Sequence, residues 1–487
     1  MLKWFITWAV RKEYTKQDYI LRYKVKFKIL QKPVIFLTKE ELLKVNIDFD
    51  KDKSVETLRE LVRFKTVSYN DAKKEDNKEF SKLVKALPKL YPDVFKKCSL
   101  KLSSERGLLF LWEGKSHDAP SVMMAHYDVV PVNEESWDKP PFEAILEDGV
   151  VWGRGTLDTK TGLWAMLQAA EELAEADYVP KRDIYFFSAC TEETGGAGAD
   201  TVSQVLQQRG IRFSLVLDEG GAVVENVFPG VKGACALVGI AEKGLMNVEY
   251  TCLSKGGHAS APKPKTPVDT LAKACVKVVK NPFKSHLSAP VAKMFDTLGR
   301  HSTFVYRMIF SNLWLFKPVL DMICKKSGGE LNALMRTTVA FTQMSGSKAA
   351  NVIPPEATMV SNMRLNPMDT MDSAVEYIKN TVNNDNIEIS VIDGMNPSRV
   401  SELDCEAYNK VATAVASTWK GCIVSPYLMV QCSDSRHYGR ISDKVYRFSA
   451  MDLTSEERAT IHGNNERIRI QAVNKTVEFY IRLIKQC

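Results

Sequence analysis

Short apolar runs that end in histidine or acidic residues recur in the first half of the chain. Three runs have this form: SVMMA (121–125) before His126 and Asp128, IYFFSAC (184–190) before Glu192 and Glu193, and FSLVL (213–217) before Asp218. Runs of this length and composition are typical of strands buried on both faces of a sheet. Between the first two lies LWAMLQAAEELAEA (163–176), whose apolar residues recur with a helical period. Strands that alternate with helices predict an α/β fold with a mixed, mostly parallel sheet flanked by helices.

The polar residues that follow these runs would meet at one edge of the sheet. Ligands of parallel sheets gather at the carboxyl ends of the strands, so a common site is expected there. The adjacent carboxylates of Glu192 and Glu193 would require compensation of their negative charge in such a site. Burying both is costly unless a positive charge lies between them, whereas a solvated acidic turn would avoid that cost. The apolar strand before the pair and the two glycines after it favour the buried alternative.

A second pattern begins near residue 241. It consists of an alternating strand (245–254), a helix (266–281), two strands (337–344 and 357–367), a helix (370–382) and a strand (387–394). This order predicts a small α+β unit of the ferredoxin-like, split βαβ type. The unit is interrupted by a segment that we expect to be a mostly helical insertion (283–335). At 487 residues the chain is too long for one core. We therefore expect an extension (1–45), a main domain in two parts (46–240 and 395–487) and an inserted domain (241–394).

The positive charge of the chain is concentrated in its amino-terminal segment. Residues 1–40 hold ten Lys or Arg and three Asp or Glu, while the whole chain has a net charge of +7. The remainder is therefore close to neutral, which argues against a nucleic-acid partner. The segment is either a solvated lead-in or a weak contact with an anionic membrane surface. No later stretch reaches about 18 apolar residues, so no transmembrane segment is expected.

Ten cysteines are scattered along the chain, and none forms a C-x-x-C pair. Free thiols in a reducing compartment fit this spacing better than a disulfide framework or a zinc ribbon does. A cytoplasmic location is therefore predicted.

Several of the polar residues have the character of metal ligands. His126 is followed two residues later by Asp128, and metal-bound imidazoles usually have a carboxylate or carbonyl that fixes their second nitrogen. Asp158 precedes the helical run, where it is either a helix N-cap or a ligand. His462, in the segment HGNNERI, is the best candidate for a second imidazole. Carboxylates with one or two imidazoles suit zinc, and less specifically cobalt or manganese.

Eight motifs in the chain resemble, in order, those of a family of zinc exopeptidases: AHYDVVPV, WGRGTLDTK, TEETGG, LDEGG, GGHAS, NVIPPEA, NMRLNP and HGNNERI. The family is metallopeptidase family twenty, which contains carboxypeptidase S, glutamate carboxypeptidase and aminoacylase. The resemblance runs from about Val62 to the carboxyl end. It is strongest to the carboxypeptidase S branch, which includes N-acyl-amino-acid hydrolases. It implies a catalytic α/β domain with an inserted ferredoxin-like lid or dimerisation domain.

The resemblance also implies two zinc ions per chain, with cobalt or manganese as substitutes. His126 and Asp218 would hold one ion, Glu193 and His462 would hold the other, and Asp158 would bridge them. The peptide bond after the bridging aspartate would be cis. Two cations would offset the acidic charge that makes the glutamate pair costly.

Further roles are implied for five residues. Glu192 would be the general base, and Asp128 would orient the first imidazole. His258 would stabilise the oxyanion, and in related dimers this histidine comes from a partner subunit, so a homodimer is an open alternative. Asn351 and Arg364 would bind the free carboxylate of the substrate, although a surface salt bridge is the other interpretation of Arg364.

The expected activity is hydrolysis of an amide bond that releases an amino acid from a short peptide, as in a carboxypeptidase or dipeptidase. An N-acyl-amino-acid amidohydrolase on the same site is one alternative, and a catalytically idle metal-binding protein is another. Gln431 and Cys432 stand where relatives usually have small residues. The shape of the substrate pocket is therefore expected to differ.

Overall fold

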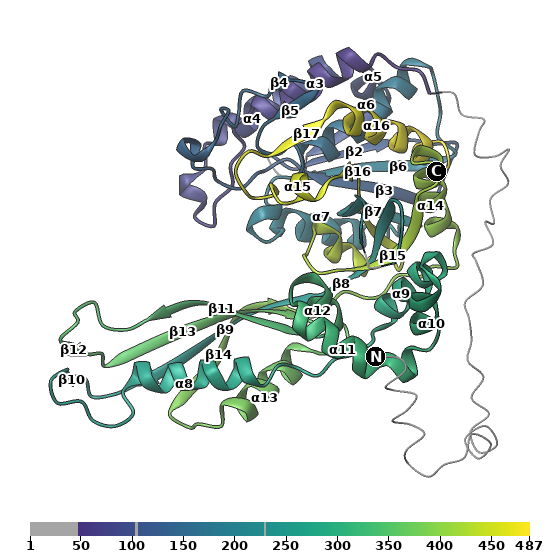
Figure 1. Ribbon diagram of the computed structural model, residues 1–487. Helices are drawn as coiled ribbons and strands as arrows, with labels where there is room; N and C mark the ends of the chain where they lie inside the picture. Colours follow the sequence, from purple (N-terminus) through teal and green to yellow (C-terminus); the bar gives the residue numbers. More distant parts are fainter. Residues whose placement is uncertain (1–46, 103–105, 228–229) are drawn as a thin grey trace, which may run out of the picture.

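An eight-stranded mixed sheet forms the centre of the larger part of the molecule (Figure 1). The computed structural model describes residues 47–102, 106–227 and 230–487, so the predicted extension (1–45) lies outside the described residues. In spatial order the strands are β1 (Cys98–Leu102), β2 (Leu108–Trp112), β6 (Arg182–Ala189), β3 (Ser116–His126), β7 (Leu215–Val224), β16 (Val445–Leu453), β8 (Cys235–Glu242) and β15 (Ile423–Met429). The four central neighbours β6, β3, β7 and β16 run parallel. The predicted α/β fold is confirmed.

Helices cover both faces of this sheet, because its central strands are apolar on both sides. On β3, Val122 and Met124 pack with α7 (Ala197–Gln208), whereas Met123 and Ala125 join the core on the opposite face. The helices that contribute to that opposite core include α3 (Lys51–Arg63), α4 (Asn77–Leu90), α5 (Pro92–Lys97), α6 (Lys160–Glu175), α14 (Glu406–Thr418) and α16 (Ile470–Ile484). The helix α6 is the one that the apolar period of residues 163–176 predicts.

A separate four-stranded antiparallel sheet forms the smaller part of the molecule, and it extends away from the large sheet (Figure 1). Its strands, in spatial order, are β11 (Thr338–Ser345), β13 (Glu356–Leu365), β9 (Gly244–Leu253) and β14 (Ile387–Met395). Two helices, α8 (Pro267–Lys280) and α13 (Met371–Val382), pack on one face and close a core of its own. The order of these elements along the chain is the predicted ferredoxin-like one. We call this part the lid.

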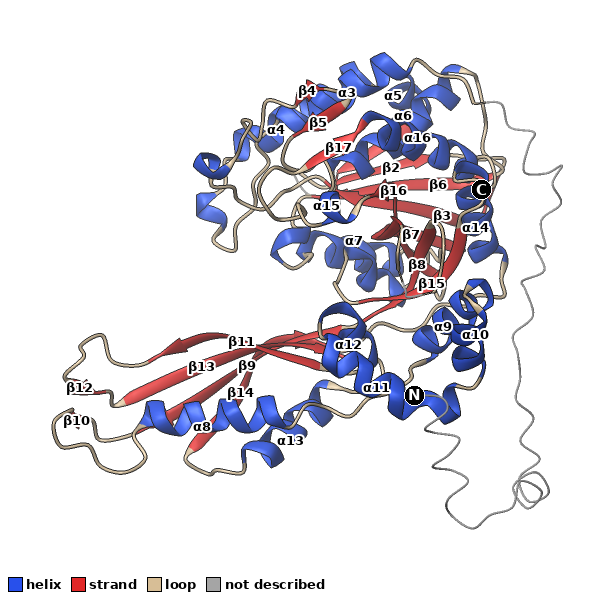
Figure 2. Ribbon diagram, viewed as in Figure 1, coloured by secondary structure: helices blue, strands red, loops and turns tan. Residues whose placement is uncertain are grey.

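The predicted helical insertion lies between α8 and β11, beside the base of the lid (Figure 2). It contains α9 (Ala289–His301), α10 (Phe304–Ser311), α11 (Leu313–Ser327) and α12 (Gly329–Met335). The buried side chains of α9, which include Phe295 and Leu298, join the core of the large sheet and not that of the lid. The insertion therefore interrupts the lid in the sequence, but in space it packs against the large sheet.

Two absences hold for the part of the chain that the structure describes. None of its helices is long and apolar enough to cross a membrane. All ten cysteines lie in this part, and none of them is in a disulfide.

Candidate active site

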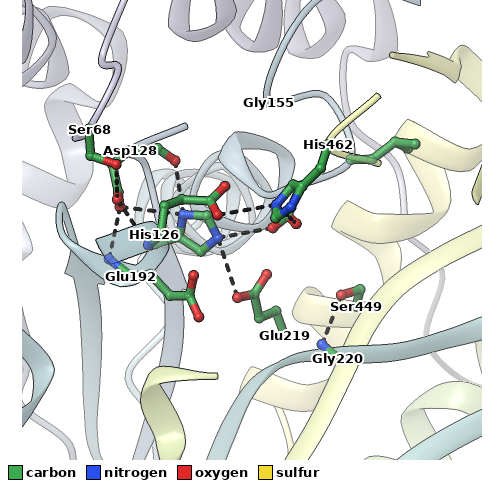
Figure 3. Close-up of polar contacts among 12 residues, drawn as sticks. Ser68, His126, Asp128, Gly155, Glu192, Glu219, Gly220, Ser449 and His462 are labelled. Atoms are coloured by element: carbon green, nitrogen blue, oxygen red, sulfur yellow. Dashed lines mark hydrogen bonds and ion pairs between the residues drawn. The ribbon is translucent and has the colours of Figure 1, made fainter. Parts of the chain in front are cut away.

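The carboxylate of Asp158 lies between two imidazoles, those of His126 and His462, which Figure 3 labels. Its Oδ1 is 3.0 Å from His126 Nε2, and its Oδ2 is 3.0 Å from His462 Nε2. His462 Nε2 also lies 3.1 Å from Glu193 Oε2. The peptide bond between Asp158 and Thr159 is cis, as the resemblance implied. Four predicted ligands from distant parts of the sequence thus meet at the carboxyl edge of the sheet.

A small sheet brings the loop of His462 to the loop of Asp158. Strand β17 (Arg467–Arg469) pairs with β5 (Val150–Trp152), which pairs with β4 (Ile145–Glu147). Next to this pairing the buried carboxylate of Glu466 accepts hydrogen bonds from the backbone N–H groups of Gly155, Leu157 and Asp158, at 2.6–3.2 Å. These contacts fix the backbone on which the central carboxylate is carried.

Asp128 supports both the first imidazole and the glutamate pair. Its backbone oxygen lies 2.9 Å from His126 Nδ1, and its carboxylate lies 3.4 Å from the same atom. The carboxylate also accepts hydrogen bonds from the backbone N–H groups of Glu192 (3.3 Å) and Glu193 (3.2 Å) and from the Ser68 hydroxyl (2.9 Å). Asp128 therefore contacts the ring of His126 and also the backbone of the turn that carries both glutamates.

The structure places Glu219, and not Asp218, beside the first imidazole. Glu219 Oε1 is 3.3 Å from His126 Nε2 (Figure 3). Asp218 is buried, and its carboxylate accepts a hydrogen bond of 2.7 Å from the backbone N–H of Ser435. Neighbouring residues of a strand point to opposite faces, so only one of this acidic pair can face the imidazole. Of the two acids that follow the apolar run, Glu219 is therefore the one that lies within hydrogen-bond distance of His126 in this structure, and Asp218 is not.

The sequence also gave no direct signal for Asp434, which is buried near the cluster in the turn η4 (Asp434–Arg440). The second glycine of TEETGG is what admits this turn. Gly196 has a φ of +73°, and a Cβ there would lie 2.4 Å from Asp434 Oδ1. Gly196 therefore allows a close approach of the two segments that a residue with a side chain would obstruct.

Acidic groups crowd the centre of the site. Burial raises the pKa of Glu192 well above its usual value, and the negative charges of Glu219, Asp434 and Asp158 raise it further. Burial likewise raises the pKa of Glu219 and of Asp434. The hydrogen bond with Asp158 raises the pKa of His462 to about 10. A positive charge bound among these buried carboxylates would therefore stabilise their ionised forms.

The residues present fit divalent cations. Ligand atoms of His126, Asp158 and Glu193 all lie within 4.8 Å of one another, and so do those of His126, Glu192 and Glu219. Glu193 Oε1 is buried and has no hydrogen-bond partner among the described residues. Imidazoles with carboxylates form a donor set that suits zinc and other first-row divalent ions. The unpartnered oxygen of Glu193 and the nearby imidazoles and carboxylates are together suited to bind a metal ion.

Two predicted residues lie far from this cluster, at the tip of the lid (Figure 1). There β10 (Gly257–His258) pairs with β12 (Val352–Ile353). His258 is exposed, and its Nδ1 lies 2.7 Å from the Ser260 hydroxyl. The backbone oxygen of Asn351 accepts a hydrogen bond of 2.9 Å from Ala259. Within one chain the structure does not bring His258 or Asn351 to the imidazoles.

Arg364 lies instead at the base of the lid, near the end of β13. Its Nη1 is 3.4 Å from Cys432 Sγ, and no described carboxylate lies within salt-bridge distance. Burial lowers the pKa of its guanidinium. A second buried cation, Arg436, donates from Nε to the Ser433 backbone oxygen and lies 3.7 Å from Glu242. Sequence reasoning missed Arg436, although it lies only four residues after Cys432, where the shape of the substrate pocket was expected to differ.

Imidazoles and carboxylates at the carboxyl edge of an α/β sheet, with an inserted ferredoxin-like lid, define a metal-dependent hydrolase of the exopeptidase class. Sequence comparison then gives the family. Residues 122–486 match Peptidase family M20/M25/M40, and the chain belongs to this family. It is therefore an enzyme that acts on amide bonds, in a family of metal-dependent enzymes.

Individual relatives match the branch that the motifs indicated. The chain is 34% identical over 454 residues to the N-fatty-acyl-amino acid synthase/hydrolase PM20D1 of Xenopus tropicalis, covering 92% of this chain and 88% of the relative. It is 33% identical over 436 residues to the probable carboxypeptidase S-like 2 of Dictyostelium discoideum, covering 88% and 84%. The predicted carboxypeptidase S and N-acyl-amino-acid hydrolase branch is confirmed.

Solved structures show the same fold at low identity. The M20 family metallo-carboxypeptidase Sso-CP2 of Sulfolobus solfataricus superimposes with a TM-score of 0.65 at 18% identity, covering 89% of this chain and 98% of that one. Human carnosine dipeptidase 1 gives a TM-score of 0.62 at 13% identity, covering 89% and 96%.

Proposed function

We propose that this protein is a dinuclear zinc hydrolase that cleaves an amide bond to release an amino acid from a short peptide. The observation that carries the proposal is the position of Asp158, with one oxygen on each of two imidazoles. We assign His126 and Glu219 to one ion and Glu193 and His462 to the other. Two such ions would lower the pKa of a water and polarise the amide carbonyl, and cobalt or manganese would substitute.

Glu192 is the proposed general base. It belongs to the same cluster as His126 and Glu219, and the amide of its own residue is held by Asp128. A carboxyl whose pKa is raised by burial is suited to accept a proton from the attacking water and to return it to the leaving amine.

Arg364 is the proposed partner of the free carboxylate of the substrate. Its guanidinium is largely buried and has no carboxylate partner in the described chain, so an incoming carboxylate would supply the missing charge. The second cation, Arg436, lies in the same region between lid and sheet.

His258 and Asn351 are proposed to act across a homodimer. Both lie at the exposed tip of the lid, remote from the imidazoles of their own chain (Figure 1). The tip of one lid would bring the oxyanion histidine and the amide to the site of a second copy.

A second candidate function is hydrolysis of an N-acyl amino acid. The relative in Xenopus tropicalis carries the name N-fatty-acyl-amino acid synthase/hydrolase, and its match covers 92% of this chain. The two functions differ only in the group on the acyl side of the amide bond. The third alternative, an idle metal-binding protein, is disfavoured because ligands and base are all present.

We also propose a reducing location such as the cytoplasm. The support is that none of the ten cysteines is in a disulfide.

The experiment combines metal analysis with a substrate panel. Purified protein is expected to hold two zinc ions per chain and to cleave a dipeptide or an N-acyl amino acid, and the ratio of the two kcat/KM values decides between the functions. Glu192→Gln should lower kcat by at least about 1,000-fold with the metal content unchanged. Exposed Glu175 supplies the matched control, Glu175→Gln, which should leave kcat unchanged. Retained turnover in Glu192→Gln would exclude the assigned base.

A further inference from the structure

The helix α11 carries an apolar stripe on its outer side. Trp314 is 63% exposed, Met322 61%, Ile323 51% and Val319 39%. Leu320 and Cys324 of the same helix are buried. At 100° per residue the four exposed side chains fall on one half of the helix, and the buried ones fall on the other half. The stripe is therefore a continuous surface feature.

The preceding helix adds to this surface. Phe304 is 62% exposed and Val305 is 55% exposed. Both lie at the start of α10, which directly precedes α11 in the sequence. Large exposed apolar side chains that recur on two consecutive helices are uncommon on monomeric proteins and mark interaction surfaces. We call α10 and α11 together the apolar hairpin; it lies beside the base of the lid (Figure 1).

The charges of the apolar hairpin are almost all positive. Between residues 304 and 327 there are four basic residues and one acid, Asp321. Asp321 is neutralised inside the protein, since it pairs with Arg336 and lies 3.4 Å from Lys325 Nζ. Lys325 and Lys326 are exposed at the carboxyl end of the stripe, opposite Trp314 at its amino end. The surface therefore joins apolar side chains to lysines, with no free carboxylate between them.

This combination has a specific chemical meaning. A helix that lies in a membrane interface has three features. Its apolar side chains enter the boundary of the acyl chains, a tryptophan lies at the level of the headgroups, and its lysines reach anionic headgroups. The helix has 15 residues and does not cross a bilayer. Lysines are depleted at protein–protein interfaces, so their place beside the apolar side chains favours anionic headgroups over a protein partner.

We propose that the apolar hairpin docks this protein on an anionic lipid bilayer, with the stripe of α11 in the plane of the interface. The proposal depends neither on the catalytic assignment nor on the basic amino-terminal segment.

The test is flotation of the full chain with vesicles of phosphatidylcholine alone and with about one third phosphatidylserine, at low and high salt. We expect binding to the anionic vesicles that weakens with salt, because the lysines are screened. Met322→Ser with Ile323→Ser should lower the partition coefficient about tenfold, since two apolar side chains no longer enter the interface. The matched control is Leu253→Ser with Met344→Ser on the lid, whose side chains are 65% and 50% exposed. It should bind as the wild type does.

Two outcomes would overturn the proposal. Undiminished binding by the α11 variant would assign the membrane contact to another segment, such as residues 1–45. A dimer in light scattering that the α11 variant dissociates would show that the stripe receives a second copy of the chain. Turnover of a water-soluble dipeptide should be equal in the variant and the wild type, which separates this result from any failure of the proposed catalytic function.

Discussion

At the residue scale, the site is organised around charge that the protein alone does not balance. Two imidazoles face the carboxylates of Asp158, Glu193 and Glu219, and Glu192 lies beside them. Burial of so many acids is costly in the absence of cations. In the metal-free protein, protons bound to these side chains are therefore expected to compete with incoming metal ions.

Metal binding should release protons. The hydrogen bond with Asp158 keeps His462 protonated up to a pKa of about 10 in the metal-free protein, and a zinc ligand must be neutral. Apparent zinc affinity should therefore rise with pH between 6 and 9, by about tenfold per pH unit for each proton released. Calorimetry in two buffers of different ionisation enthalpy measures the number of protons, which we expect to be at least one. A buffer-independent enthalpy would contradict this picture.

The glycine pair offers a sharper test of local geometry. Gly195→Ala and Gly196→Ala both place alanine at a positive φ, but only the second meets a neighbour, Asp434 Oδ1 at 2.4 Å. Backbone strain of about 1 kcal/mol is common to both. Displacement of the turn η4 should make kcat/KM of Gly196→Ala at least about 100-fold lower than that of Gly195→Ala. Equal kcat/KM values would mean that the turn does not position the site.

At the scale of elements, the site depends on how closely strands and turns approach one another. A Cβ at Gly221 of β7 would lie 1.8 Å from the backbone oxygen of Leu237 in β8. The junction of β8 and β9 is a single residue, Lys243, whose buried ammonium donates to the backbone oxygens of Ala333 and Arg336 at 2.8 Å each. These contacts fix the sheet edge and the base of the lid.

Gly221→Ala should destabilise the protein strongly. Because the clash is with backbone, the two strands must separate, at a cost of about 3 kcal/mol or more. Gly439→Ala is the control, since a Cβ there meets nothing within 4 Å, and its effect should stay within about 0.5 kcal/mol. Urea unfolding followed by circular dichroism measures both, and equal midpoints would refute the close approach.

Lys243 should make stability depend on pH. Burial lowers its pKa to about 7, below the 10.5 of the unfolded chain. Between these values the unfolded state holds one more proton than the folded state, so the free energy of unfolding should rise with pH from about 7 to 10. In Lys243→Met this contribution disappears, and the pH slope should be smaller than in the wild type. Lys255→Met, at an exposed site, should keep the wild-type slope.

At the scale of the whole molecule, two separate cores meet at a narrow junction. The large sheet and the lid each close a core of their own, and the insertion packs with the former. The lid is joined through Lys243 on one side and the segment after Met395 on the other, where a Cβ at Gly244 would lie 2.7 Å from the Met395 oxygen. The tip with His258 is thereby held away from the site of its own chain (Figure 1).

Complementation tests the proposed dimer. His258→Ala and Glu192→Gln should each be inactive alone. After the two are mixed and exchanged, heterodimers would hold one intact composite site, so about a quarter of wild-type activity should return. No recovery, with subunit exchange shown by mass spectrometry, would place the histidine in the site of its own chain.

The sequence by itself determined the order of elements and the family, and it named several of the residues that lie together in the candidate site. The apolar runs fixed β3, β6 and β7, and the residues that follow them had to share one edge because parallel strands end together. It named Asp218 and did not consider Glu219, because the contact with His126 depends on how β7 is placed in the folded chain. The sequence also could not identify Asp434 or show that the insertion packs against the large sheet. Nor could it show how far His258 lies from the imidazoles of the site. Each of these is a long-range contact, decided by packing between segments that are far apart in the chain.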